Sequence, residues 1–146
     1  MKRYFMSSIN TARLGAVQLI YQMQTTGIGA KQALLNKGAY FSGKELDGVE
    51  FIPADLELLT KIVEGYESRQ EEIEQIISSI SKYELSRLEI ILQCILKAGV
   101  YEILDNTEEY TKGNIISAYL DITNSFYDKK EIGIINVILD KVANSI

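Results

Sequence analysis

Positively charged and aromatic side chains interleave near the start of the chain, in a pattern that could hold a nucleic acid. The residues concerned are Lys2, Arg3, Tyr4, Phe5, Arg13 and Tyr21. Cations of this kind neutralise phosphates, and aromatic rings stack on unpaired bases, which is how single-stranded RNA is commonly bound. Tyr4 and Phe5 could equally pack the amino terminus against a hydrophobic core. The pattern therefore suggests RNA binding without deciding for it.

The residue types that are missing exclude most catalytic chemistry. The chain has no histidine, so Ser-His-Asp and Cys-His nucleophilic sites and histidine-bearing metal sites are excluded. Its single cysteine, Cys94, can form neither an intrachain disulfide nor a multi-cysteine zinc site. We therefore expect a protein that is not an enzyme and that carries no cofactor or metal.

The charge is divided unevenly along the chain. Residues 1–44 carry 6 basic and no acidic residues, whereas residues 45–146 carry 9 basic and all 20 acidic ones. A basic end on an acidic chain indicates an anionic partner for that end. The alternative is that the acidic helices simply fall later in the chain.

Apolar residues recur at helical spacing almost throughout, which predicts an all-α protein of about seven helices. Asn10 or Thr11 is expected to cap the first helix, which buries Ala12, Ala16, Leu19, Ile20 and Met23. We expect later apolar stripes of Leu56, Leu59, Ile62, Val63 and Tyr66, of Ile73, Ile76, Ile77 and Ile80, and of Ile132, Ile135, Ile138, Leu139 and Val142. The expected helices cover about 10–24, 30–36, 53–66, 70–80, 86–104, 114–126 and 130–144, with a loop at 37–52.

The stretch from Ser86 to Leu104 is apolar almost all round, which predicts a buried central helix. Cys94 should be an inert core thiol there. The most apolar part, Ile90 to Val100, contains Gln93 and Lys97 and is too short to span a bilayer. We therefore expect a cytoplasmic protein without a membrane segment. Separately, we expect two subdomains, at 1–66 and 67–146.

Two further groups of residues have simpler explanations than binding chemistry. The stretch from Gly27 to Lys31 lacks the spacing of a phosphate-binding loop, and a helix end followed by a turn explains it better. The acidic groups at 71–74 and 108–109 have no spaced partner ligands. We expect them on solvated helix faces and loops.

Four segments together resemble the NusB family of bacterial transcription antitermination factors. The first is ARLGAVQLIYQ at 12–22, which is similar to the opening helix of that family. Three further segments follow in the family's order and at about its spacing: LLTKIVEG at 58–65, YELSRL at 83–88 with ILKAGVYEI at 95–103, and IINVILDK at 134–141. The resemblance covers nearly the whole chain.

This resemblance implies an all-helical fold of two packed subdomains and an activity of binding rather than catalysis. Together with ribosomal protein S-ten, also called NusE, such proteins engage the boxA segment of nascent RNA. The complex helps RNA polymerase to read through terminators in ribosomal RNA operons. Some relatives are monomers and others are dimers, so a homodimer stays open.

The same resemblance implies which residues face RNA. Arg13 and Tyr21 match the family's RNA-facing positions on the first helix, and Gln18, which lies further round the helix, is a further candidate. Lys2 and Arg3 stand near its basic amino-terminal run. Asn136 matches an asparagine of the last helix, for which a polar clasp between helices is the alternative. Lys129 and Lys130, just before that motif, would add phosphate contacts.

Four positions depart from the family pattern. Tyr83 replaces a tryptophan, Lys97 an arginine, Ser117-Ala118 an asparagine-glutamate pair, and Ile134 an aromatic residue. Since Ile134 cannot stack on a base, the departures suggest weaker RNA affinity.

A second hypothesis is a protein-interaction module that keeps the fold and the ribosomal-protein contact. A related alternative is an RNA-binding domain of the kind fused to ribosomal RNA cytosine methyltransferases, with the methyltransferase on a separate partner because this chain is too short to carry it. The third hypothesis is a small enzyme, for which the sequence supplies no base, nucleophile or metal site.

Overall fold

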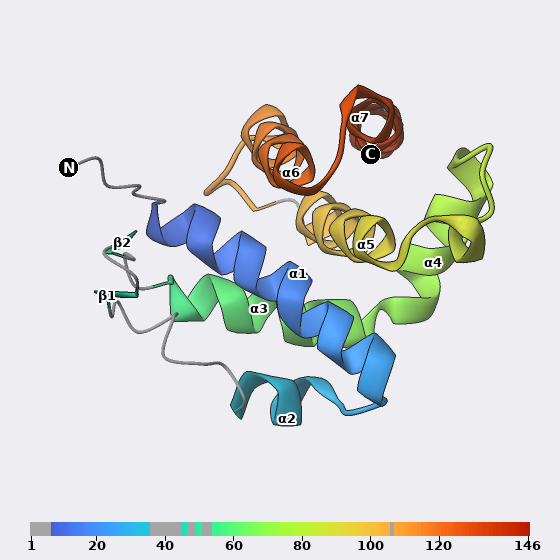
Figure 1. Ribbon diagram of the computed structural model, residues 1–146. Coiled ribbons are helices and arrows are strands. Elements are labelled where there is room, and N and C mark those ends of the chain that lie inside the picture. The colour runs from blue at the N-terminus through green and yellow to red at the C-terminus, as the bar shows by residue number, and fades with distance from the viewer. Residues whose placement is uncertain (1–6, 36–44, 47–48, 51–53, 106) are drawn as a thin grey trace. The chain divides into compact units, whose positions relative to one another are not determined.

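The computed structural model describes residues 7–35, 45–46, 49–50, 54–105 and 107–146, and within them the fold is all-α (Figure 1). This confirms the predicted fold class. The α-helices are α1 (Ser8–Thr26), α2 (Ala30–Leu35), α3 (Leu56–Ser68), α4 (Gln70–Ile80), α5 (Ile90–Asp105), α6 (Lys112–Phe126) and α7 (Lys129–Asn144). A single 3-10 turn, Leu85–Arg87, precedes α5.

The predicted loop at 37–52 contains a small departure from an all-helical chain. Strands β1 (Glu45–Leu46) and β2 (Val49–Glu50) pair antiparallel, with Glu45 opposite Glu50 and Leu46 opposite Val49. Strands this short give no alternating apolar pattern, which is why the sequence did not reveal them. The other residues of this stretch lie outside the described part of the chain.

Helix ends follow local capping chemistry. The prediction that Asn10 or Thr11 caps the first helix is wrong, because the Ser7 hydroxyl accepts a hydrogen bond from Asn10 N at 3.1 Å. Gly27 ends α1 with φ of 79°, a left-handed conformation that glycine adopts without strain. The Asp55 carboxylate accepts from Leu58 N at 3.0 Å, and α3 starts at Leu56, three residues after the predicted start at 53. Pro53, predicted in that first turn, lies outside the described residues.

The chain divides into two compact units, residues 1–64 and 65–146, with the division inside α3. In the first unit α1 packs with α2, and Asp55 N donates to Ser8 O at 2.9 Å. In the second unit α5, α6 and α7 pack against one another, and α4 contacts both α5 and α7.

The apolar stripes fill the core with four exceptions. Leu56 is 46% exposed, since it is the first residue of α3 and lies outside the packed part of its stripe. Ile76, Ile80 and Ile132 are half-buried, whereas the other predicted stripe residues of all four helices are buried.

Helix α5 is the buried helix that the sequence predicts, and two charged side chains lie in it among apolar ones. Lys97 is only 4% exposed, and its Nζ lies 3.6 Å from Glu74 Oε2 on α4 and 5.8 Å from the centre of the Tyr66 ring. The buried Glu102 carboxylate accepts from the Tyr119 hydroxyl on α6 at 2.6 Å. Both pairs satisfy charges that would be costly to bury alone, and they tie neighbouring helices to α5.

No helix among the described residues is long and apolar enough to cross a membrane.

Candidate nucleic-acid interface

The first set of predicted RNA-facing residues lies along α1. Arg13, Gln18 and Tyr21 follow its length, and Arg13 and Tyr21 are eight residues, or about 12 Å, apart along the helix axis. The apolar residues of α1 face the core as predicted, and this fixes which way the remaining faces point. Tyr21 is 39% exposed and is the exposed large hydrophobic side chain of this helix, while Gln18 is half-buried.

Arg13 lies deeper than a purely phosphate-binding residue would. It is 3% exposed, and its Nη1 donates to Asn10 Oδ1, one turn earlier, at 3.4 Å. A buried guanidinium keeps its charge and needs several acceptors, so Arg13 contributes to the fold as well as to the local potential. The ring of Tyr21, by contrast, offers a face to solvent.

The second set of predicted residues lies at the start of α7. Lys129 and Lys130 are the first two residues of this helix, and both are exposed. Positive charges are unfavourable at a helix N-terminus, where the macrodipole is itself positive. Glu131 offsets part of this charge, since its side chain accepts from Asp128 N at 3.2 Å. The lysines are therefore not explained by helix stability, and an anion at this end would relieve their repulsion.

Lys129 and Asn136 share one face of α7, and Lys130 lies on another. At ~100° per residue, positions seven apart lie nearly above one another, whereas Lys130 and Asn136 are about 120° apart. Asn136 is exposed, and its side chain has no hydrogen bond within the part of the chain that the structure describes. The alternative of a polar clasp between helices is therefore not observed there.

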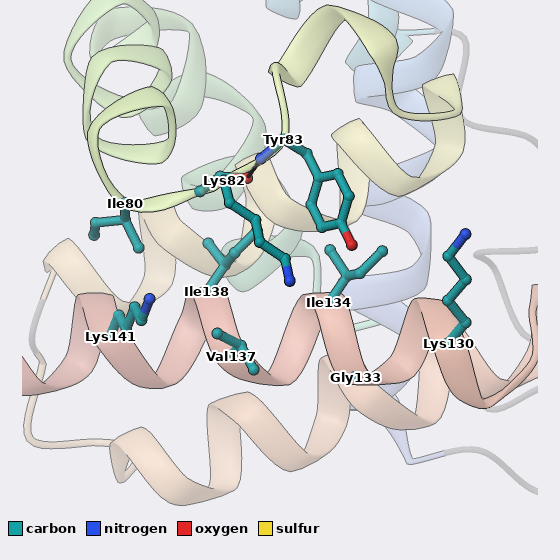
Figure 2. Close-up of a pocket in the computed structure, with 10 residues that line it drawn as sticks. Ile80, Lys82, Tyr83, Lys130, Gly133, Ile134, Val137, Ile138 and Lys141 are labelled. Atoms are coloured by element: carbon teal, nitrogen blue, oxygen red, sulfur yellow. Dashed lines mark hydrogen bonds between the residues drawn. The ribbon is translucent and has the colours of Figure 1, made fainter.

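Lys130 instead lines a groove of about 390 Å³ that runs along α7 (Figure 2). The other wall is the connection between α4 and the 3-10 turn, which contributes Lys82 and Tyr83. We call this the α7 groove and define it by residues 80–83 together with Lys130, Gly133, Ile134, Val137, Ile138 and Lys141. Sequence analysis missed Lys82 and Lys141 as site residues. Their signal is a set of lysines bordering an apolar helix face, visible only once the two segments are brought together.

The predicted site therefore falls into separate parts. Arg13, Gln18 and Tyr21 belong to the first unit, and Lys129, Lys130 and Asn136 belong to the second. Lys2 and Arg3 lie outside the described residues.

The described residues contain no cluster of three or more histidine, cysteine or acidic side chains that could hold a metal ion. Cys94 is fully buried, and this burial raises the pKa of its thiol to about 12. The thiolate that nucleophilic chemistry needs is therefore suppressed in the folded protein. Among the acidic residues, Glu72 has a local partner, because it pairs with Arg69 at 2.8 Å at the start of α4.

Comparison with known proteins shows the family and the fold. Residues 10–144 match the profile of the NusB family. The transcription antitermination protein NusB of Mesorhizobium japonicum is 36% identical over 137 residues, covering 92% of this chain and 88% of its own. That of Bartonella henselae is 34% identical, covering 92% of this chain and 86% of its own. The solved structure of T. maritima NusB has a TM-score of 0.75 at 17% identity and covers 97% of this chain and 93% of its own, which shows the shared fold.

The fold and these side chains define a small helical protein with cationic and aromatic groups on its helices. The match over residues 10–144 and the relatives above 30% identity show more: the chain belongs to the NusB family of transcription antitermination proteins.

Proposed function

We propose that this protein binds boxA-like single-stranded RNA together with ribosomal protein S-ten (NusE) and so promotes read-through of ribosomal RNA operons. The observation that carries the proposal is Tyr21, an exposed ring on a helix whose other large apolar residues are buried or half-buried. It stands at a position where the family resemblance implies an RNA-facing tyrosine. A ring on a rigid helix can stack on an unpaired base at little entropic cost.

The charged and polar residues have different roles in this proposal. Lys129 and Lys130, with Lys2 and Arg3, contact phosphates and give salt-dependent affinity. Arg13 adds positive potential from its buried position, and Gln18 and Asn136 offer hydrogen bonds to base edges. Affinity from the lysines alone carries no sequence preference. Any preference for boxA therefore comes from the region around Tyr21, from Asn136 and from the ribosomal partner.

In this proposal the protein acts in the cytoplasm, as a non-enzymatic member of the RNA polymerase antitermination complex. The RNA-facing residues would come from both of the expected subdomains, 1–66 and 67–146. A homodimer that buried α1 would mask the aromatic part of this surface.

A protein-interaction module with little RNA affinity of its own is the second candidate. Two observations favour it: the chain carries a net charge of -5, and the aromatic residue that the resemblance leads one to expect is the aliphatic Ile134. In this version the ribosomal protein supplies most of the RNA contacts.

Fluorescence anisotropy of a labelled boxA-type RNA, against a scrambled RNA of equal length, tests the proposal over a salt series. We expect tighter binding to the boxA sequence, further strengthened by the ribosomal protein and weakened by salt. The interaction module would be favoured by two results together: the affinity for the ribosomal protein does not change when RNA is added, and the folded protein alone does not bind RNA. Equal binding of both RNAs under all conditions would contradict boxA recognition.

A further inference from the structure

The α7 groove combines an apolar floor with a cationic border. Ile134, Val137 and Ile138 form the floor. Val137 is 52% exposed, Ile134 is half-buried, and Ile138 is 3% exposed. These residues recur at the spacing of one helix face, so the floor is a continuous strip along α7. A partly exposed apolar strip with a polar border is typical of a surface that a partner covers.

Three lysines border this floor, and no acidic residue lines it. Figure 2 shows Lys130 and Lys141 toward opposite ends of the strip, with Lys82 reaching over it from the other wall. The two outer lysines are eleven residues, or about 16 Å, apart on α7. Residues 65–146 hold 14 acidic and 8 basic residues, so an all-lysine border runs against the local charge. None of the three lysines forms an ion pair within the described residues.

Gly133 lies in the interior of α7, where glycine is unfavourable compared with alanine. A Cβ at this position would meet nothing within 4 Å, so packing inside the described chain does not require a glycine. The absence of a side chain leaves the helix backbone open at the groove. Small residues of this kind allow a second helix to approach closely.

We propose that the α7 groove binds an acidic amphipathic helix of a partner protein. Aliphatic side chains spaced three and four residues apart would pack on Ile134, Val137 and Ile138, as in other helix-in-groove complexes. Asp and Glu side chains flanking them would pair with Lys82, Lys130 and Lys141. The partner's backbone would pass over Gly133.

The aliphatic floor is the reason to favour a protein over RNA at this groove. Bases stack on aromatic rings and guanidinium planes, and the floor offers neither. Tyr83 is the aromatic residue of the lining, and it belongs to the opposite wall. The proposal concerns residues of the second unit and shares Lys130 with the phosphate contacts proposed above. It stands or falls separately from RNA binding by α1.

A displayed library of random peptides of about four helical turns, ~14 residues, provides the test with the full-length protein as bait. We expect enriched peptides to carry Leu, Ile, Val or Met at intervals of three and four, together with Asp or Glu. The proposal would be overturned if the enriched peptides were basic or aromatic. It would also be overturned if no enriched peptide needed the groove for binding.

Two matched pairs of variants show whether an enriched peptide occupies the groove. Gly133→Leu fills the space above α7, and Gly113→Leu adds the same side chain at an open position of α6 outside the groove. We expect the first to weaken peptide binding by at least about tenfold and the second to leave it unchanged. Lys141→Glu should weaken binding about fivefold, in contrast to Lys31→Glu on α2. Circular dichroism confirms that each variant is folded, and unchanged binding by Gly133→Leu would refute the assignment.

The same variants distinguish the other occupants. Loss of affinity for a labelled oligoribonucleotide in Gly133→Leu, without any groove-dependent peptide, would make the groove an RNA surface. Loss of self-association in Gly133→Leu, measured by sedimentation, would make its occupant a second copy of this chain. Either result would overturn the proposal of a partner helix.

Discussion

Arg13 and Tyr21 lie eight residues apart on α1, yet Arg13 is 3% exposed and Tyr21 is 39% exposed. Their positions along one helix suggest a shared role, but their environments separate them. Arg13 is held within the protein, whereas Tyr21 presents its ring to solvent. Substitutions at the two positions should therefore have different effects on stability and similar effects on RNA affinity.

Arg13→Ala should lower the free energy of unfolding by about 2 kcal/mol as well as weaken RNA binding, because it removes a buried hydrogen-bonding cation. Urea denaturation measures the stability, with Lys31→Ala on α2 as an exposed control. An unchanged unfolding midpoint together with lost RNA binding would show that Arg13 serves RNA alone.

Tyr21→Ala should leave the unfolding midpoint nearly unchanged and weaken boxA binding by about 1 to 3 kcal/mol, the usual contribution of one stacked base. Tyr21→Phe keeps the ring and should retain most of the affinity. Anisotropy titrations of the three proteins provide the comparison. Equal affinity of wild type and Tyr21→Ala would remove the ring from the interface.

Two glycine-to-alanine substitutions should have opposite signs. A Cβ on Gly65 would overlap the Tyr101 ring within the second unit, so Gly65→Ala should destabilise the protein by about 1 to 3 kcal/mol. A Cβ on Gly133 meets nothing, so Gly133→Ala should stabilise α7 by up to about 1 kcal/mol. Thermal unfolding followed by circular dichroism measures both. Equal effects at the two positions would contradict the packing around Tyr101.

The ion pair between Arg69 and Glu72 predicts a small acid dependence of stability. Hydrogen bonds from Arg69 at 2.8 and 3.0 Å lower the pKa of the Glu72 carboxyl below its usual range. A lowered folded pKa gives stability that is fully present above the unfolded value of about 4.3 and is lost as the pH falls through the folded value. NMR titration should show the lowered pKa in wild type and its return toward the usual value in Arg69→Met. An identical titration in both proteins would contradict the pairing.

The helices could be predicted from the sequence because each one has its own local pattern of apolar residues. The stripe of α1 and the apolar circumference of α5 are local patterns. The stripe is buried as predicted, and the apolar residues of α5 are buried from Leu92 to Ile103, whereas Ile90 at its start is 37% exposed. The error at the start of α1 is also local: Ser7, Asn10 and Thr11 all have capping side chains, and the folded backbone selects Ser7.

The remainder depends on residues far apart in the chain. Lys97 looks like part of an exposed polar strip until Glu74, 23 residues earlier, and the Tyr66 ring are placed beside it. The α7 groove likewise joins residues 80–83 to a helix some fifty residues later. No periodicity within either segment indicates that they meet.

The central claim is that RNA binds along α1 and at the start of α7. Mapping the RNA contact on the folded protein tests this claim most directly. Amide chemical shifts are followed by NMR while a boxA-type RNA is added, with a scrambled RNA as the control. We predict progressive shifts at Gln18, Tyr21 and Lys129–Glu131 with the boxA RNA and weaker ones with the control. Shifts absent from α1, in a protein that stays folded, would contradict the account.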